Sequence, residues 1–434
     1  MRILDARALS AADAARALVR DRAPWDRALA ASREILDRVA RDGDEALLAL
    51  AGRFDGVRPP RLVLRREDFE SALGRIPRDL RDALAFAADR IRVFHRAQVP
   101  VGYEVPLGPG GSRAGQQPRA LDRVGVYVPA GPAGYPSSVL MGVIPARLAG
   151  VREVVVATPP SKTGTPPDSV LAAAALAGVD EVLVSGGAQA IGALAFGTAS
   201  VRPVDKIVGP GNLYVTAAKL LVQDRVATDG IAGPSEVLVV ADETLSTEAL
   251  AAELLAQAEH DPEAVVIGVL VDDRSAEEVQ RTVRRRASVL PRSSDVLATL
   301  ERNGTLVRVA SASQAIELAN GLAPEHLVLA IRDADSFLYA VRNAGCVFLG
   351  PSTTAPLGDY TAGTNHILPT AGSARSRGGL GVRDFVKFLS YVEAAPSDLP
   401  ALAAAGATIA RAEGFPAHAA ALESRLSAKE AVLP

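Results

Sequence analysis

The chain has 434 residues and a formal net charge of −3, and 48% of its residues are hydrophobic although only 4% are aromatic. This length predicts more than one domain, with cores built mainly from Ala, Val, Leu and Ile. The nearly balanced charge gives no reason to expect a nucleic-acid or acidic-membrane partner. The single cysteine, Cys346, excludes an internal disulfide framework and is typical of a reducing compartment.

The beginning of the chain carries acidic and arginine side chains every few positions. It therefore lacks the apolar stretch of a signal peptide. Elsewhere no uncharged apolar run approaches the roughly 18 residues that a membrane span needs. We expect a soluble, cytoplasmic protein.

In chain order, residues 1–23 predict a short arm with one helix. From residue 25 to residue 98 the apolar residues follow a helical period, and Pro100 ends this section. From residue 122 short β-branched runs alternate with helical stretches, which is typical of parallel βαβ units. The alternation restarts at residue 236, so we expect two similar α/β halves.

A Gly- and Pro-rich stretch then predicts loops, and the helical pattern returns in the last part of the chain, beginning with RDFVKFLSYVEA. We assign residues 24–126 and 236–380 to a main α/β domain and residues 127–235 to a second α/β domain. We assign residues 381–434 to a helical tail, whose residue pattern differs from that of the α/β domains. We expect this tail to pack on another domain or on another subunit.

One pair of metal-ligand types occurs in the stretch LLAQAEHDP, which places Gln257 and His260 three residues apart. A helix that is capped at Ser246 or Thr247 and stopped by Pro262 puts both side chains on one face. Such a pair at a helix end can hold a metal. A surface glutamine beside a capping histidine is the alternative.

Three further histidines each have a carboxylate nearby in the sequence: His326 with Glu325, His366 with Asp359, and His418 with Glu413. Glu325 and His326 would point to opposite faces of a regular strand. Both can face one site only from the loop before the next strand, where Pro324 favours a loop and where catalytic residues are common. Histidine titrates near neutrality and suits proton transfer. Chance proximity in a chain with 22% charged residues is the alternative.

Glycine-rich turns follow predicted strands at SGGAQAIG, VGPGN and DGIAGPSE. Turns of this kind bring backbone amides to a phosphate, although the same glycines are found in any α/β domain. The chain has no G-x-G-x-x-G, so a standard dinucleotide fingerprint is not indicated. Cys346 begins a predicted buried strand, where a packing role is favoured over that of a nucleophile.

These segments resemble the histidinol dehydrogenase family over essentially the whole chain. The matching motifs are, in order, FHRAQ, VGVYVPAG, GGAQAIGALAFGT, GPGNLYVTAAK, DGIAGPSE, LLAQAEHDP, NGLAPEHL, GDYTAGTNHILPT and EGFPAH. The resemblance implies an α/β fold with two incomplete Rossmann-like parallel-sheet domains, a helical N-terminal arm and a helical C-terminal tail. The incomplete domains would account for the missing dinucleotide fingerprint.

The resemblance also implies a set of site residues. One zinc ion per subunit would be bound by Gln257, His260, Asp359 and His418, and the catalytic pair would be Glu325 with His326 as the main base. Substrate would contact Ser235, Gln257, His260, His326, Asp359, His366, Glu413 and His418, and NAD would contact Tyr127, Gln189 and Asn212. The family forms homodimers whose tails cross, so Glu413 and His418 would serve the partner's site.

The implied reaction is the four-electron oxidation of L-histidinol to L-histidine through bound histidinal, with two NAD+, at the end of histidine biosynthesis. The chain has ARSRGGLGV at residues 374–382, with Ser376 where family members often have an aromatic residue. A related zinc- and NAD-dependent enzyme acting on another polar alcohol, such as sulfopropanediol, is therefore one alternative. The others are an aldehyde-type dehydrogenase using Cys346, a structural zinc site, and a non-catalytic imidazole- or zinc-binding protein. A structural zinc site usually contains cysteine, and this ligand set has none.

Overall fold

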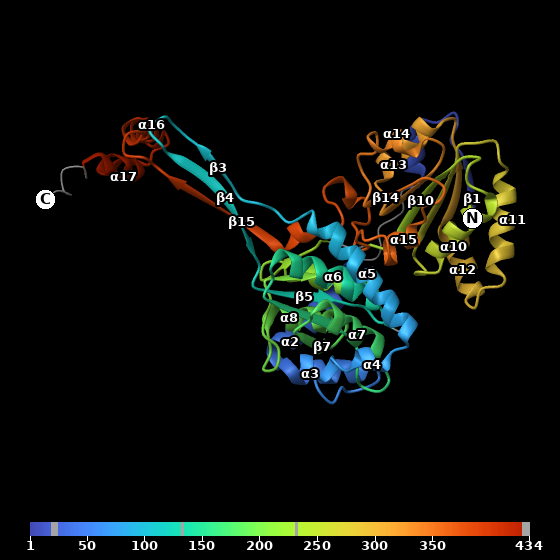
Figure 1. Cartoon of the computed structure of the whole chain (residues 1–434). Coiled ribbons are helices and arrows are strands. Elements are labelled where there is room, and N and C mark those ends of the chain that lie inside the picture. Colours follow the sequence, from blue (N-terminus) through green and yellow to red (C-terminus); the bar gives the residue numbers. More distant parts are fainter. Residues whose placement is uncertain (19–24, 132–133, 231–232, 428–434) are drawn as a thin grey trace. The chain divides into compact units, whose positions relative to one another are not determined.

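The computed structural model describes residues 1–18, 25–131, 134–230 and 233–427. The chain divides into two compact units. The first unit consists of Met1–Gln98 and Leu121–Phe385, and the second consists of Val99–Ala120 together with the chain from Val386 onward. Figure 1 shows the elements of each unit.

The first unit contains two six-stranded sheets. In one of them every neighbouring pair of strands is parallel. Its strands, in spatial order, are β1 (Arg2–Asp5), β12 (Gly304–Arg308), β11 (Val265–Leu270), β10 (Glu236–Ala241), β13 (His326–Ala330) and β14 (Cys346–Leu349). We call this sheet the β10 sheet.

Apolar residues of the β10 sheet alternate between two cores, as the two-residue period of a strand requires. In β10 itself Val237 and Val239 face one core, and Leu238 and Val240 face the other. The first core is covered by α10 (Thr247–Ala258), α11 (Ala276–Ala287) and α12 (Ser293–Asn303), and the second by α1 (Ala11–Leu18) and α13 (Ala312–Leu322). Two short helices, α14 (Ala334–Leu338) and α15 (Ala355–Tyr360), follow β13 and β14.

The second sheet of this unit, here called the β5 sheet, is parallel except for its edge strand β2. Its spatial order is β2 (Val63–Arg65), β7 (Glu181–Val184), β6 (Glu153–Thr158), β5 (Arg123–Tyr127), β8 (Lys206–Val208) and β9 (Ala227–Thr228). Val154 and Val156 face one core, whereas Val155 and Ala157 face the other.

The helices of the β5 sheet cover both of its faces. The Val155 face packs against α2 (Trp25–Phe54), α8 (Gly187–Phe196) and α9 (Leu213–Leu221). The opposite face packs against α3 (Arg66–Phe69), α4 (Ala72–Arg75), α5 (Arg78–Arg96), α6 (Pro136–Ala149) and α7 (Asp168–Ala177). Two 3-10 turns, η1 (Ser373–Arg375) and η2 (Val382–Phe385), complete the unit. The α/β fold with two parallel-sheet halves is as the sequence predicts.

The division between the halves differs from the predicted one. Helices α2 and α5 pack on α8, α9 and α6, so residues 25–98 and 121–126 lie with the β5 sheet and not with residues 236–380, whereas residues 99–120 belong to the second unit. The apolar period shows that a helix buries one face, but it does not show which sheet covers that face. The described part of the predicted N-terminal arm, residues 1–18, is also more than a helix, because β1 is an edge strand beside β12 and α1 packs on α13.

The second unit is an antiparallel three-stranded sheet that leads to two helices (Figure 1). Strand β4 (Arg113–Ala120) lies between β3 (Tyr103–Pro106) and β15 (Val386–Glu393), and the helices are α16 (Leu399–Ala412) and α17 (Pro416–Ser427). The helix expected over RDFVKFLSYVEA is wrong: after η2 this segment forms β15. Its Val, Phe and Tyr residues favour a strand, and β4 pairs with it along its whole length.

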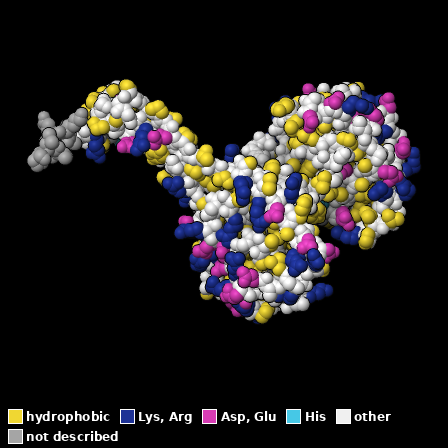
Figure 2. All heavy atoms as spheres, viewed as in Figure 1, with side chains coloured by type: hydrophobic (Ala, Val, Ile, Leu, Met, Phe, Trp, Pro, Cys, Tyr) yellow, Lys and Arg dark blue, Asp and Glu magenta, His cyan; other side chains and the backbone are white. Residues whose placement is uncertain are grey.

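The core of the second unit is small, and among the described residues its buried apolar residues are four alanines, Ala403, Ala407, Ala410 and Ala419. Larger apolar side chains remain exposed, among them Val101, Tyr103, Phe388, Leu389, Val392, Ile409 and Phe415. Figure 2 shows apolar side chains at the surface of this unit. In the part of the chain that is described, no helix has both the length and the apolar composition needed to cross a bilayer.

Candidate active site

The candidate site lies where two neighbouring strands of the β10 sheet begin. Strand β10 starts at Glu236 and β13 at His326, and the register pairs His326 with Val237. Glu325 is the last residue before β13. The site is therefore at the amino edge of this sheet, whereas ligands of open α/β sheets generally bind at the carboxyl edge.

Glu325 and His326 are both buried, each with 5% of its surface exposed. The Glu325 Oε2 atom accepts a hydrogen bond from the Glu236 amide at 2.8 Å. The same oxygen lies 3.5 Å from His326 Nδ1. Because Glu325 precedes the strand and His326 begins it, the two side chains face each other instead of pointing to opposite faces.

The environment of the His326 ring defines its tautomer. Nδ1 lies 3.1 Å from the carbonyl oxygen of Glu236, which can only accept, so Nδ1 carries the proton. Nε2 is buried without a hydrogen-bond partner and lies 3.3 Å from Asp359 Oδ1. The ring also stacks on Phe348 with centroids 5.9 Å apart. When the ring is neutral, its free lone pair is therefore on Nε2.

Charges around the His326 ring shift the pKa values of His326 and of Asp359. Burial by itself lowers the pKa of His326, but the carboxylates of Glu325 and Asp359 outweigh it and hold that pKa well above its ordinary value. Burial raises the pKa of Asp359, and the neighbouring His326, His366 and His260 more than reverse this effect, so that its pKa is lowered. The three histidines therefore surround one carboxylate.

His366 connects this carboxylate segment to the other half of the unit. Its Nδ1 lies 2.9 Å from the carbonyl oxygen of Asp359, so Nδ1 donates. Its Nε2 lies 3.1 Å from the Ser138 hydroxyl, which then donates to it. Burial lowers the pKa of His366, which favours this neutral, doubly hydrogen-bonded ring.

Gln257 and His260 lie at the end of α10. The helix is capped by the Ser246 side chain, as predicted, and ends at Ala258, with His260 in the exposed turn that follows. Gln257 is 5% exposed. The Glu253 carboxylate on the same helix accepts a hydrogen bond of 3.4 Å from the Ala355 amide at the start of α15. This contact holds α10 against the helix that carries Asp359.

Within the described residues, no group of three or more His, Cys, Asp and Glu side chains is arranged to hold a metal ion. Of the four ligands that the resemblance implies, Gln257 is an amide and His418 belongs to the second unit, which leaves His260 and Asp359. The Nε2 atom of the buried Gln257 amide lacks a hydrogen-bond partner. Rotating this amide exchanges its nitrogen and oxygen, so it can offer an oxygen to a cation. Mixed nitrogen and oxygen donors fit zinc.

The predicted NAD contacts lie at the carboxyl edge of the β5 sheet. Tyr127 ends β5, and its buried hydroxyl accepts a hydrogen bond of 3.0 Å from the Gly187 amide. Burial raises the pKa of this phenol to about 12, so it stays protonated. Gln189 is buried in the first turn of α8, and Asn212 caps α9 by accepting from the Tyr214 and Val215 amides.

The remaining predicted residues are placed as follows. Ser235 directly precedes β10, beside the amino edge that holds the acid–histidine cluster. Glu413 and His418 lie in the second unit, where Glu413 ends α16 and the His418 ring on α17 contacts Phe415 at 5.3 Å. The first unit thus brings together Glu325, His326, Asp359, His366 and the end of α10.

Three side chains at the site were missed by the sequence analysis. Glu236 has its pKa raised to about 7 by burial and by Glu325. Ser138 bonds to His366, and Glu253 joins α10 to α15. Glu236 could have been noticed as an acid at the start of a predicted buried strand. No sequence signal places Ser138 next to a histidine 228 residues away.

Cys346 is next to His326 in the sheet, because the β13–β14 register pairs the two residues. Burial raises the pKa of its thiol, so the reactive thiolate is disfavoured. This setting favours the packing role and is unfavourable for the aldehyde-type alternative.

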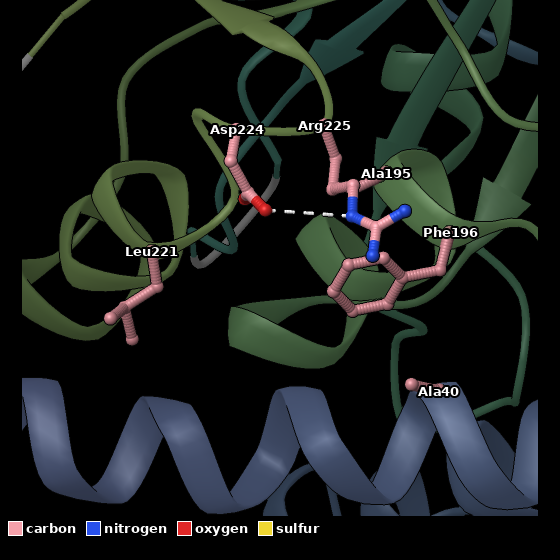
Figure 3. Close-up of a pocket in the computed structure, with 6 residues that line it drawn as sticks. All are labelled: Ala40, Ala195, Phe196, Leu221, Asp224 and Arg225. Atoms are coloured by element: carbon pink, nitrogen blue, oxygen red, sulfur yellow. Dashed lines mark ion pairs between the residues drawn. The ribbon is translucent and has the colours of Figure 1, made fainter.

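A surface hollow of about 490 Å³ lies elsewhere on the first unit. It is lined by Ala40, Ala195, Phe196, Leu221, Asp224 and Arg225 (Figure 3). The ion pair drawn there joins Asp224 and Arg225 at 3.5 Å, and both side chains are largely exposed. The lining of the hollow includes none of the predicted site residues.

Two mainly parallel six-stranded sheets, one of them with a buried acid–histidine cluster at its edge, define an α/β protein with a site suited to proton transfer. The family model described as histidinol dehydrogenase matches residues 19–426. The chain belongs to the histidinol dehydrogenase family and is an oxidoreductase.

Individual relatives agree with the family match. The histidinol dehydrogenase of Methanothermobacter thermautotrophicus is 45% identical over 393 residues, which cover 91% of this chain and 92% of that protein. The Rhodopseudomonas palustris histidinol dehydrogenase is 46% identical over 402 residues, with 92% of each chain covered. The crystal structure of histidinol dehydrogenase from Elizabethkingia anophelis superposes with a TM-score of 0.91 at 32% identity, covering 99% of this chain and 98% of the other.

Proposed function

We propose that the chain oxidises L-histidinol to L-histidine in two steps through bound histidinal, with zinc and two NAD+, in the histidine biosynthesis of the cytoplasm. The observation that carries this proposal is the His326 ring, whose Nε2 is buried and has no hydrogen-bond partner beside Asp359. Within a family of histidinol dehydrogenases, such a nitrogen is suited to accept the proton of a substrate hydroxyl.

The geometry assigns each group of the cluster a task. The Glu236 carbonyl holds the proton on His326 Nδ1, which leaves Nε2 as the accepting atom. Glu325 lies against the same ring and is available to take a proton from the water that adds to the aldehyde. Asp359 as a metal ligand would share its charge with the cation, so it would raise the pKa of His326 less strongly.

The proposed zinc ligands are Gln257, His260, Asp359 and the partner subunit's His418. When bound, zinc would orient the substrate by taking its imidazole and amine. Ser235, His366 and Glu413 are the further proposed substrate contacts. The half-buried ring of His366 is held by hydrogen bonds at both nitrogens, so it offers a fixed contact to a small polar molecule.

The proposed cofactor site is the carboxyl edge of the β5 sheet, with Tyr127, Gln189 and Asn212. This is the edge at which α/β sheets generally bind nucleotides. Helices α8 and α9 both begin at this edge, and the positive end of a helix dipole is a favourable place for a diphosphate. NAD+ would accept one hydride in each of the two oxidations.

A homodimer is proposed because the second unit lacks a cover for its apolar surface. Val101 is 84% exposed, Val392 is 72% exposed and Ile409 is 60% exposed, although the buried apolar residues described in this unit are four alanines. Exposed apolar surface of this kind marks an interaction site. A second copy of the chain would cover it and would bring Glu413 and His418 to the partner's site, as in the crossed dimer of the family.

The reaction is tested by counting products. With L-histidinol and excess NAD+, we expect two NADH for each histidine and little free histidinal, because Glu325 and His326 serve the two oxidations in one cavity. The NADH absorbance and the amounts of histidine and aldehyde by chromatography give the ratio. One NADH per substrate with released aldehyde would contradict the four-electron reaction.

The metal site is tested by replacing Gln257 with alanine. The variant should lose its zinc and its turnover and still fold, because α10 contributes Leu250 and Leu254 to a core that does not include Gln257. Metal content by mass spectrometry and thermal unfolding measure the two effects. Gln280→Ala is the matched control, since that amide donates to the Met1 carbonyl at 2.7 Å on another helix. Full zinc content in Gln257→Ala would show that the ligand assignment is incorrect.

The alternatives lack a supporting observation. The relatives with high identity over more than nine tenths of the chain are histidinol dehydrogenases, so a sulfopropanediol-type substrate is not favoured. The Glu325–His326 pair suits proton transfer, which a binding protein without catalysis does not need. Assays with L-histidinol and other polar alcohols, in the presence of NAD+, compare these functions directly.

A further inference from the structure

A buried ion pair that the proposed reaction does not use lies beneath the β8–α9 turn. Lys219 on α9 and Asp229, just after β9, are 2.8 Å apart, and their side chains are 3% and 12% exposed. Taking two charges out of water is costly, and their mutual attraction often does no more than balance that cost. The buried Lys219–Asp229 ion pair is therefore better explained by a role other than stabilising the fold.

The pair holds the peptide groups of one residue, Gly209. The Lys219 ammonium donates to the Gly209 carbonyl, and Asp229 Oδ2 accepts from the Gly209 amide at 2.7 Å. The two charges thus fix both the carbonyl and the amide of this glycine. Gly209 directly follows β8, so it starts the turn that leads to Asn212 and the first turn of α9.

The conformation of Gly209 places it in close contact with Tyr127, so the position of this glycine affects the end of β5. Its φ is +114°, and a Cβ built on it would lie 2.1 Å from the Tyr127 carbonyl oxygen. The turn is therefore pressed against the end of β5, where only glycine fits. Displacing Gly209 would move Tyr127 and Asn212 relative to each other, and these are two of the three proposed NAD contacts.

We propose that Lys219 and Asp229 are positioning residues for the dinucleotide: the ion pair fixes the Gly209–Asn212 turn against Tyr127 and so shapes the NAD site. The proposal rests on the cofactor site assigned above. It involves no contact between Lys219 and NAD, because the ammonium is already bonded to Asp229 and Gly209.

The test removes both charges together in Lys219→Met/Asp229→Asn, so that no unpaired charge stays buried. We expect the Kd for NAD+, measured by calorimetry on the full chain, to rise roughly 10- to 100-fold, since small displacements of a binding group have effects of this size. The KM for L-histidinol should not change. Asp229→Asn alone keeps the shape of the side chain and is the second variant, with a smaller rise expected.

The matched control is another buried ion pair in the same unit. Arg274 and Asp272 are 2.7 Å apart with side chains 11% and 15% exposed, and they follow the carboxyl end of β11, away from the amino edge that holds His326. Arg274→Met/Asp272→Asn should lower the thermal unfolding temperature without changing the Kd for NAD+. Weaker NAD+ binding in this control too would reduce the Lys219 effect to general destabilisation and overturn the proposal.

Asn212→Ala separates this inference from the proposed function. If Asn212→Ala weakens NAD+ binding and the folded Lys219/Asp229 variants do not, the positioning role is wrong and the cofactor site stands. If neither change weakens NAD+ binding, the cofactor site itself is misplaced, and the positioning role is overturned with it. Weaker NAD+ binding in both Asn212→Ala and the Lys219/Asp229 variants supports the positioning role.

Discussion

Replacing His326 with asparagine is expected to slow the first oxidation by about 10²- to 10⁴-fold, the usual contribution of a general base. Asparagine can still donate to the Glu236 carbonyl, but it has no basic nitrogen to replace Nε2. The affinity for L-histidinol should hold, because the proposed metal ligands and not His326 fix the substrate. Single-turnover NADH formation and calorimetric binding of L-histidinol measure the two quantities separately.

The control for His326→Asn is Cys346→Ala, which changes the residue paired with His326 across the sheet. This variant removes a packed thiol that burial keeps protonated, and near-normal turnover is expected. Loss of turnover in Cys346→Ala would instead support a thiol nucleophile. A large loss of L-histidinol affinity with unchanged turnover in His326→Asn would reassign His326 to binding.

The Glu325–His326 pair shows how much of the candidate site could be predicted from the sequence. The adjacency of Glu325 and His326, with Pro324 before them, indicated that both could face one site from the loop before a strand, with chance proximity as the alternative; in the structure Glu325 precedes β13 and His326 begins it. What could not be predicted is the neighbouring strand: Glu236 supplies an amide to Glu325 and a carbonyl to His326 from 89 and 90 residues away. Register between strands depends on the whole sheet, and one sequence does not contain it.

The errors in the fold have a related cause. Helices α2 and α5 have clear apolar faces, and the prediction placed them on the wrong sheet because a stripe does not identify its partner. The segment that forms β15 was assigned a helix because its neighbours are helical, whereas its Val, Phe and Tyr residues and its pairing with β4 decide for a strand. Contacts with distant segments therefore determine both which sheet α2 and α5 cover and why the β15 segment is a strand.

The two sheets of the first unit present opposite edges to their proposed ligands. Tyr127 and Gly209 lie at the carboxyl ends of β5 and β8, the usual place for a nucleotide. His326 and Glu236 begin β13 and β10, so this sheet uses its amino edge. Its carboxyl ends are therefore free of the proposed chemistry, which is why the Asp272–Arg274 pair can serve as a control.

Mixing two inactive variants, His418→Ala and His326→Ala, is expected to restore activity if the active site is shared between subunits. A mixed dimer has one site with both lesions and one site with neither, since intact His326 of one chain meets intact His418 of the other. Random exchange makes about half of the dimers mixed, so roughly a quarter of wild-type activity should return in a two-fold dimer.

The physical reason to expect sharing is the position of His418 in a unit that cannot bury its own apolar surface. His418 lies on α17, exposed beside the exposed Phe415, and the buried apolar residues described in this unit are four alanines. Subunit exchange is followed by activity after mild denaturation and refolding, with each variant refolded alone as the control. If the tail serves its own subunit, every site keeps one lesion and mixing restores nothing. The crossed arrangement would then be wrong even if Gln257, His260 and Asp359 bind zinc.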